Sequence, residues 1–86
     1  MTTLTKHRKK IDRIDQKLLK LLSKRMNSCE KIGCYKKRNN AKITDKEREE
    51  KLLRRISKRA EKHNLNKTFI NNIFQEIFNE SKRLQK

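Results

Sequence analysis

The chain has 86 residues, of which 31% are hydrophobic and 5% aromatic, so it can form one small domain but has little apolar material for a core. Its formal net charge of +16, from 26 Lys and Arg against 10 Asp and Glu, predicts an anionic partner: nucleic acid, an anionic membrane surface or a small anionic ligand. No run of residues is long and apolar enough to span a membrane, which excludes a transmembrane protein. High charge with low hydrophobicity is also typical of disorder, but the apolar residues recur at helical spacing and favour a folded chain.

The chain contains no proline and one glycine, and it lacks the alternation typical of strands, so we expect an all-α fold of three helices in a single domain over residues 1–86. The first helix is predicted from about Leu4 to about Arg38, which makes it about 50 Å long. A globule of this size has a radius of gyration of roughly 12 Å, so such a helix overhangs its own domain. A second copy of the chain would cover the overhang, and we therefore expect a homodimer.

A polar break at residues 39–42 ends the first helix. Thr44 and Glu47 have the spacing of a capping box, and the second helix is predicted from about Asp45 to about His63. Asn66 is the expected N-cap of a third helix that runs from about Lys67 to Leu84. Apolar residues mark the buried sides of these two helices: Leu52, Leu53, Ile56 and Ala60 on the second, and Ile70, Ile73, Phe74, Ile77 and Phe78 on the third.

The two cysteines, Cys29 and Cys34, lie about 140° apart around the first helix and cannot form a disulfide within it. They have no CxxC spacing and no clustered histidines, so we expect no metal site. We predict reduced thiols that pack as small apolar residues in a cytoplasmic protein, because the N-terminus also lacks the apolar stretch of a signal peptide.

Three cationic residues occupy the face of the first helix that should pack against neighbours. That face follows alternating steps of three and four residues: Arg8, Ile11, Asp15, Leu18, Leu22, Arg25, Cys29, Ile32 and Lys36. Each cation could instead extend to solvent or pair with a buried carboxylate. Because three lie on one stripe in a chain with few carboxylates, we favour a pocket that holds an anionic ligand.

The other two helices add polar groups at their buried faces. Ser81 and Gln85 lie one turn apart on the core side of the third helix, although residues so near a C-terminus are often solvated. Glu49 borders the buried face of the second helix, and Asp45 stands at its start, where capping alone would explain it. No nucleophile paired with a base and no glycine-rich phosphate loop is present, so the pattern indicates recognition and electrostatics without a cofactor or a covalent intermediate.

Three segments in order resemble the AroQ class of chorismate mutases. Residues 8–25 with 32–36 resemble the opening helix of that family, residues 45–53 its second-helix motif and residues 74–85 the end of its third helix. The resemblance covers nearly the whole chain. The family includes both free-standing enzymes and domains of bifunctional proteins, and the resemblance fits either. It implies an intertwined homodimer of three-helix chains that converts chorismate to prephenate, with no cofactor and no metal.

The resemblance also implies roles for seven residues. Arg8 would reach the active site of the other subunit, and one chain would supply the remaining substrate-binding residues: Arg25, Lys36, Asp45, Glu49, Ser81 and Gln85. Four of these would be catalytic: Lys36, Gln85, Arg25 and Glu49. Lys36 and Gln85 would donate to the ether oxygen of the substrate, and the two arginines would each hold a carboxylate.

Two alternatives stay open. An isochorismate-pyruvate lyase on the same scaffold would use similar cations, and one sequence separates it poorly from a mutase. A basic helical nucleic-acid-binding module would suit the net charge, but its cations should gather on a solvent-facing surface and not on core stripes. We therefore expect no specific nucleic-acid partner and no membrane partner.

Overall fold

The computed structural model describes residues 2–42 and 45–86 and contains three helices, with no strand in these ranges. Helix α1 spans Thr3–Arg38, α2 spans Lys46–Lys62 and α3 spans Lys67–Gln85. Each helix begins and ends within one residue of the bounds expected from the sequence. The prediction of an all-α fold with a very long first helix is confirmed.

A side-chain oxygen caps the start of each helix. The side chain of Thr2 accepts a hydrogen bond from the backbone N–H of Thr5 at 3.3 Å, and Asn66 accepts from that of Phe69 at 2.9 Å, as expected for an N-cap. Asp45 caps α2 by accepting from the backbone N–H of Arg48 at 3.1 Å. The capping box predicted for Thr44 lies outside the described residues.

Asparagines end the first two helices. Asn40 and Asn64 adopt positive φ angles of 54° and 56°, in the left-handed region that asparagine tolerates better than most residues. Each is followed by a backbone hydrogen bond that closes the last turn: Ala41 N–H to the Lys36 carbonyl at 2.8 Å, and Leu65 N–H to the Ala60 carbonyl at 2.9 Å. This Schellman pattern satisfies carbonyls that the helix itself leaves unpaired and turns the chain sharply.

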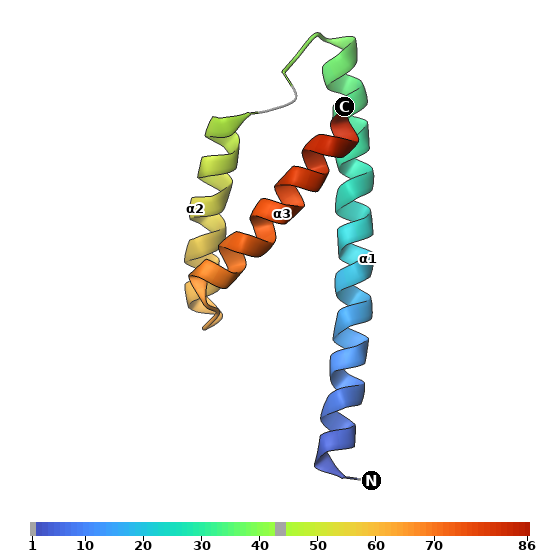
Figure 1. Cartoon of the computed structure of the whole chain (residues 1–86), viewed down its shortest axis with the longest axis vertical. Helices are drawn as coiled ribbons and strands as arrows, with labels where there is room; N and C mark the ends of the chain where they lie inside the picture. The colour runs from blue at the N-terminus through green and yellow to red at the C-terminus, as the bar shows by residue number, and fades with distance from the viewer. Residues whose placement is uncertain (1, 43–44) are drawn as a thin grey trace.

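Helix α3 lies between the other two helices and packs against both (Figure 1). Its start lies beside the end of α2, and its C-terminal end crosses the upper half of α1 in the view of Figure 1. The N-terminal half of α1 extends well past α2 and α3. The molecule measures 57 × 24 × 15 Å with a radius of gyration of 16.4 Å, larger than that of a globule of this length because of this overhang.

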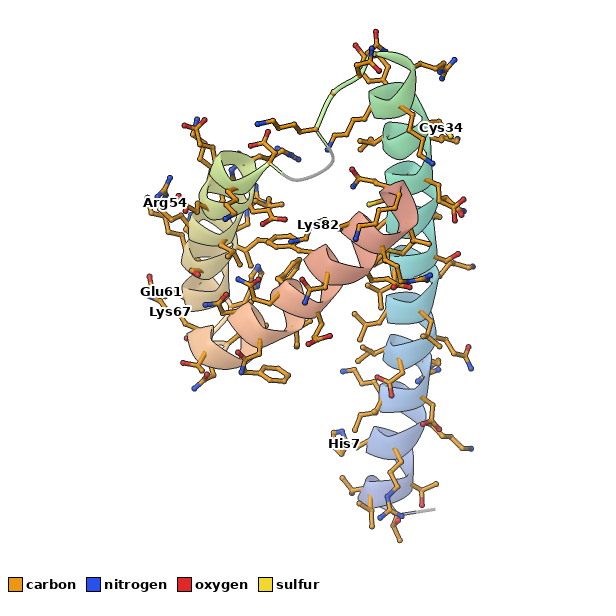
Figure 2. All side chains as sticks on the ribbon, turned by 45° about the horizontal axis from the view of Figure 1, so that its top comes forward. His7, Cys34, Arg54, Glu61, Lys67 and Lys82 are labelled. Carbon is orange, nitrogen blue, oxygen red and sulfur yellow. The ribbon has the colours of Figure 1, made fainter. Side chains whose placement is uncertain are left out.

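The core of the single chain is small. Among the described residues, the buried hydrophobic ones are Cys29, Ala60 and Phe78, and the Phe74 and Phe78 rings meet edge to face at 6.2 Å. The expectation that both cysteines pack inside is wrong for Cys34, which is exposed on the outer side of α1 (Figure 2). Within the described ranges, no helix combines the length and the apolar character needed to cross a bilayer.

Candidate active site

A cavity of about 130 Å³ opens where the C-terminal half of α1, the start of α2 and the end of α3 converge. The structure brings six of the seven predicted site residues together in its wall: Arg25, Lys36, Asp45, Glu49, Ser81 and Gln85. Apolar side chains complete the lining: Cys29, Ile32, Leu52 and Phe78. Two further cations, Arg48 and Lys82, also line it.

Two contacts hold Arg25 against α3, and a third lies within α1. Its Nη1 donates to the Ser81 hydroxyl at 2.6 Å and to the sulfur of Cys29 at 3.6 Å, and its guanidinium lies 5.8 Å from the centre of the Phe78 ring. The Ser81 hydroxyl in turn donates to the Ile77 carbonyl at 2.8 Å, which leaves its lone pairs directed to Arg25. The guanidinium is therefore fixed in orientation, and its remaining N–H groups can serve a planar anion such as a carboxylate.

Lys36 and Gln85 form the second bridge between α1 and α3. The Lys36 ammonium donates to Oε1 of Gln85 at 3.0 Å, and Gln85 is buried. With its carbonyl oxygen bound to Lys36, the side-chain amide of Gln85 keeps its N–H₂ group as the donor for a ligand. Within the described ranges, no buried side-chain nitrogen or oxygen lacks a hydrogen-bond partner, so both buried polar residues, Ser81 and Gln85, are accounted for.

Gly33 permits the close approach of α1 and α3 beside this bridge. A Cβ atom at Gly33 would lie 2.6 Å from the Cα of Gln85 and 2.9 Å from its carbonyl oxygen, both of them backbone atoms. A side chain there would force the helices apart and carry Gln85 away from Lys36. The sequence carried a signal for this role, because a lone glycine inside a helix costs about 1 kcal/mol relative to alanine and usually has a packing reason.

Helix α2 contributes acidic groups to the opposite wall. The Asp45 carboxylate caps the helix, and Glu49, one turn later, forms an ion pair of 3.3 Å with Lys82 of α3. Sequence reasoning missed Lys82 and Arg48 as lining residues. Lys82 follows Phe78 by one turn and Ser81 by one residue, a spacing that places it at the edge of the same face, but it is hard to single out among 26 cationic residues.

Arg8, the seventh predicted residue, lies apart from the cavity. It is exposed on the overhanging half of α1, about 25 Å of helix before Arg25. His7 and His63 are exposed near helix ends, as expected, and neither lines the cavity.

The cavity suits a small dianion. Four cations and two carboxylates line it, which leaves a formal charge of +2.

Away from the cavity, on the exposed face of α3, a hydrogen bond from Arg83 lowers the pKa of the Glu80 carboxyl below its ordinary value. In the described part of the chain, no group of three or more His, Cys, Asp or Glu side chains is placed to hold a metal ion.

Comparison with known proteins adds independent information. The family described as chorismate mutase type II matches residues 7–86. The chain is 37% identical over 83 residues to a chorismate mutase of Methanocaldococcus jannaschii, covering 96% of this chain and 84% of that protein. It is 42% identical over 79 residues to a bifunctional chorismate mutase/prephenate dehydratase of Buchnera aphidicola, covering 92% of this chain but 20% of that protein. The chain thus spans about a fifth of the length of such bifunctional relatives.

The fold also matches a solved structure. A conserved hypothetical protein from Pyrococcus furiosus superposes with a TM-score of 0.80 at 38% sequence identity, covering all of this chain and 99% of that one. The long first helix and the arrangement of the two shorter ones are therefore shared with a protein whose structure has been determined.

Proposed function

Since the chain belongs to the chorismate mutase type II family, we propose that it catalyses the rearrangement of chorismate to prephenate. The observation that carries the proposal is a cavity in which two cations of α1 face the hydrogen-bonding groups of α3 and a carboxylate of α2. Chorismate carries two carboxylates, an ether oxygen and a ring hydroxyl. The cavity offers cations for the carboxylates, hydrogen-bond donors for the ether oxygen and an acceptor for the ring hydroxyl.

The reaction is an intramolecular Claisen rearrangement, in which one C–O bond breaks while one C–C bond forms. It needs no proton transfer and no cofactor. An enzyme can accelerate it by holding the compact conformer that reacts and by stabilising negative charge that grows on the ether oxygen. A site made of fixed donors and cations meets both demands.

Arg25 serves as the clamp for one carboxylate. Its contacts with Ser81 and Phe78 fix the plane of the guanidinium, so little side-chain freedom remains to be lost when the ligand binds. Ser81 contributes by holding Arg25, because its hydroxyl is already engaged with that residue and with the Ile77 carbonyl.

Lys36 and Gln85 donate to the ether oxygen. Their mutual hydrogen bond of 3.0 Å places an ammonium and an amide side by side, as two donors to one oxygen require. Because the charge on that oxygen grows along the reaction coordinate, these hydrogen bonds strengthen in the transition state and lower the barrier as well as improving binding.

The start of α2 receives the ring hydroxyl. Glu49 accepts a hydrogen bond from it, with the backbone near Asp45 assisting. The Asp45 side chain is engaged in capping α2, so its contribution is to fix the position of this first turn.

The active enzyme is a homodimer in which Arg8 enters the partner's cavity and clamps the second carboxylate. Support comes from the overhanging half of α1, where large apolar side chains lie exposed: Leu4, Ile11, Ile14, Leu18, Leu19, Leu21 and Leu22. An apolar surface of this extent on one helix marks a contact with another chain. A second copy offers the same stripe and, with two-fold symmetry, completes two cavities at once.

The free thiols of Cys29 and Cys34 fit the reducing environment of the cytoplasm, where we place the enzyme.

The direct experiment follows the loss of chorismate absorbance with the purified chain, with isochorismate assayed in parallel. We expect rapid loss of chorismate with formation of prephenate. Pyruvate release from isochorismate, without conversion of chorismate, would identify the lyase instead. No turnover of either compound by a folded dimer would contradict the proposal.

A further inference from the structure

An ion pair lies inside the cavity, between α2 and α3. The Lys82 ammonium is 3.3 Å from Oε1 of Glu49, and the two side chains are only 29% and 27% exposed. Both residues line the cavity. A pair shielded to this degree is screened less by water and salt than a surface pair, so its charges affect anything that binds beside it.

A second lysine–glutamate pair provides an internal comparison. Lys67, the first residue of α3, pairs with Glu61 near the end of α2, and these side chains are 55% and 58% exposed. Figure 2 shows this pair at the far end of α3 from Lys82. Both pairs tie α2 to α3 with the same chemistry, but the Lys67 pair stands outside the cavity.

Glu49 presents an electrostatic difficulty in a site for a dianion. An acceptor for a ring hydroxyl is useful there, but a half-buried carboxylate repels a ligand that brings two negative charges. Lys82 offsets that negative charge and occupies Oε1, which leaves Oε2 as the oxygen that can accept from the hydroxyl. The other charged groups that line the cavity around Glu49 come from α1 and from the start of α2: Arg25, Lys36, Asp45 and Arg48.

We propose that Lys82 is a positioning residue for substrate binding, which neutralises and orients Glu49 so that a hydroxyl acceptor can sit in a cavity that binds a dicarboxylate. This inference rests on the proposed function. Lys82 acts through Glu49 and stays bound to it during the reaction, so its contribution is uniform across ground state and transition state. Its loss therefore raises KM and leaves kcat nearly unchanged.

The test compares the full chain with three single variants. Lys82→Met keeps the length and apolar stem of the side chain and should raise KM for chorismate about tenfold, with kcat changed less than about twofold. Lys82→Arg retains the charge and should stay close to wild type. Lys67→Met removes the same charge and the equivalent pair outside the cavity, and it should leave both constants unchanged.

A double-variant cycle separates neutralisation of Glu49 from direct attraction of the substrate. In a Glu49→Gln background there is no carboxylate to neutralise, so adding Lys82→Met should change KM less than about twofold. The same tenfold rise in that background would show that Lys82 attracts the substrate directly, and the inference would be wrong. Circular dichroism and thermal melting of each variant exclude loss of folding as the cause.

The remaining outcomes are equally decisive. An active wild type whose KM does not respond to Lys82→Met overturns this inference alone, as does an equal response to Lys67→Met. A large fall in kcat at unchanged KM would make Lys82 a transition-state donor and would also overturn it. A folded wild type that does not convert chorismate overturns the proposed function and this inference together.

Discussion

The two halves of α1 carry the same apolar periodicity but have different surroundings. In the C-terminal half, Cys29 is buried and Gly33 lies against α3, while Arg25 and Lys36 bridge to Ser81 and Gln85. In the N-terminal half, the apolar side chains at positions 11, 14 and 18 are about half exposed. The apolar stripe continues along the whole of α1, but α3 packs against only the C-terminal half of that helix (Figure 1).

This difference assigns separate tasks to one helix. The C-terminal half builds a cavity with groups supplied by its own chain, and we propose that the N-terminal half builds the dimer and delivers Arg8. A substitution in the C-terminal half should lower catalytic activity and leave the dimer intact. A substitution in the N-terminal half should weaken the dimer, and activity should fall because the dimer is lost.

The largest effect is expected for Lys36→Ala, in the packed half. Loss of one donor to the ether oxygen should lower kcat about 100- to 1,000-fold, because that interaction is strongest in the transition state. The fold and the dimer should persist, as measured by circular dichroism and analytical ultracentrifugation. Substantial residual turnover would remove Lys36 from its proposed role.

Gln85→Glu should move activity to acid pH. A carboxyl group can donate to the ether oxygen only when it is protonated, so turnover should be low at neutral pH and rise as the pH falls. The measurement is the pH profile of kcat/KM, with the wild type as the reference. An unchanged profile would mean that Gln85 does not touch the ether oxygen.

Leu18→Asp places a charge in the middle of the exposed stripe. If this surface is the dimer interface, a buried unpaired carboxylate should dissociate the dimer, and activity per chain should fall at least about tenfold because Arg8 no longer reaches a cavity. Gln16→Asp is the matched control, since it adds the same charge on the opposite face of the same turns. Equal sedimentation and activity for the two variants would contradict a dimer through this stripe.

Gly33→Ala should give the smallest loss of activity and a measurable loss of stability. The added methyl would lie 2.6 Å from a backbone atom of Gln85, so α1 and α3 must separate by a fraction of an ångström, and overpacking of this kind costs about 1–3 kcal/mol. The midpoint of urea unfolding and kcat should both fall. Cys34→Ala, at the next and exposed position, should change neither.

The sequence predicts most of the fold because its signals are local. Helix periodicity, the Asn66 cap and the asparagine-rich breaks each depend on neighbouring residues, and the observed bounds follow them. The convergence of Arg25, Lys36, Ser81 and Gln85 was also predictable, because polar residues on apolar stripes must meet where the stripes meet.

Other features of the site depend on distances between helices, which periodicity does not give. Lys82 and Arg48 resemble the many solvated cations of this chain until α2 and α3 are placed relative to each other. The partner of Glu49 could not be read from spacing either, because the pair joins two helices whose relative register is set by packing. The exposed position of Cys34 is a different case, because helical spacing alone places it about 140° around α1 from the buried Cys29, away from the apolar stripe.

The most direct test of an active site shared between two chains is complementation. Arg8→Ala and Lys36→Ala chains, each inactive alone, are mixed, unfolded and refolded to form mixed dimers. If Arg8 serves the partner's cavity, each mixed dimer holds one intact site, and random pairing should restore about one quarter of wild-type activity. A mixture of Arg25→Ala and Lys36→Ala chains should stay inactive, because both lesions lie in the part of the site that each chain builds for itself. Failure of the first mixture to exceed the summed activity of its components would contradict the shared site.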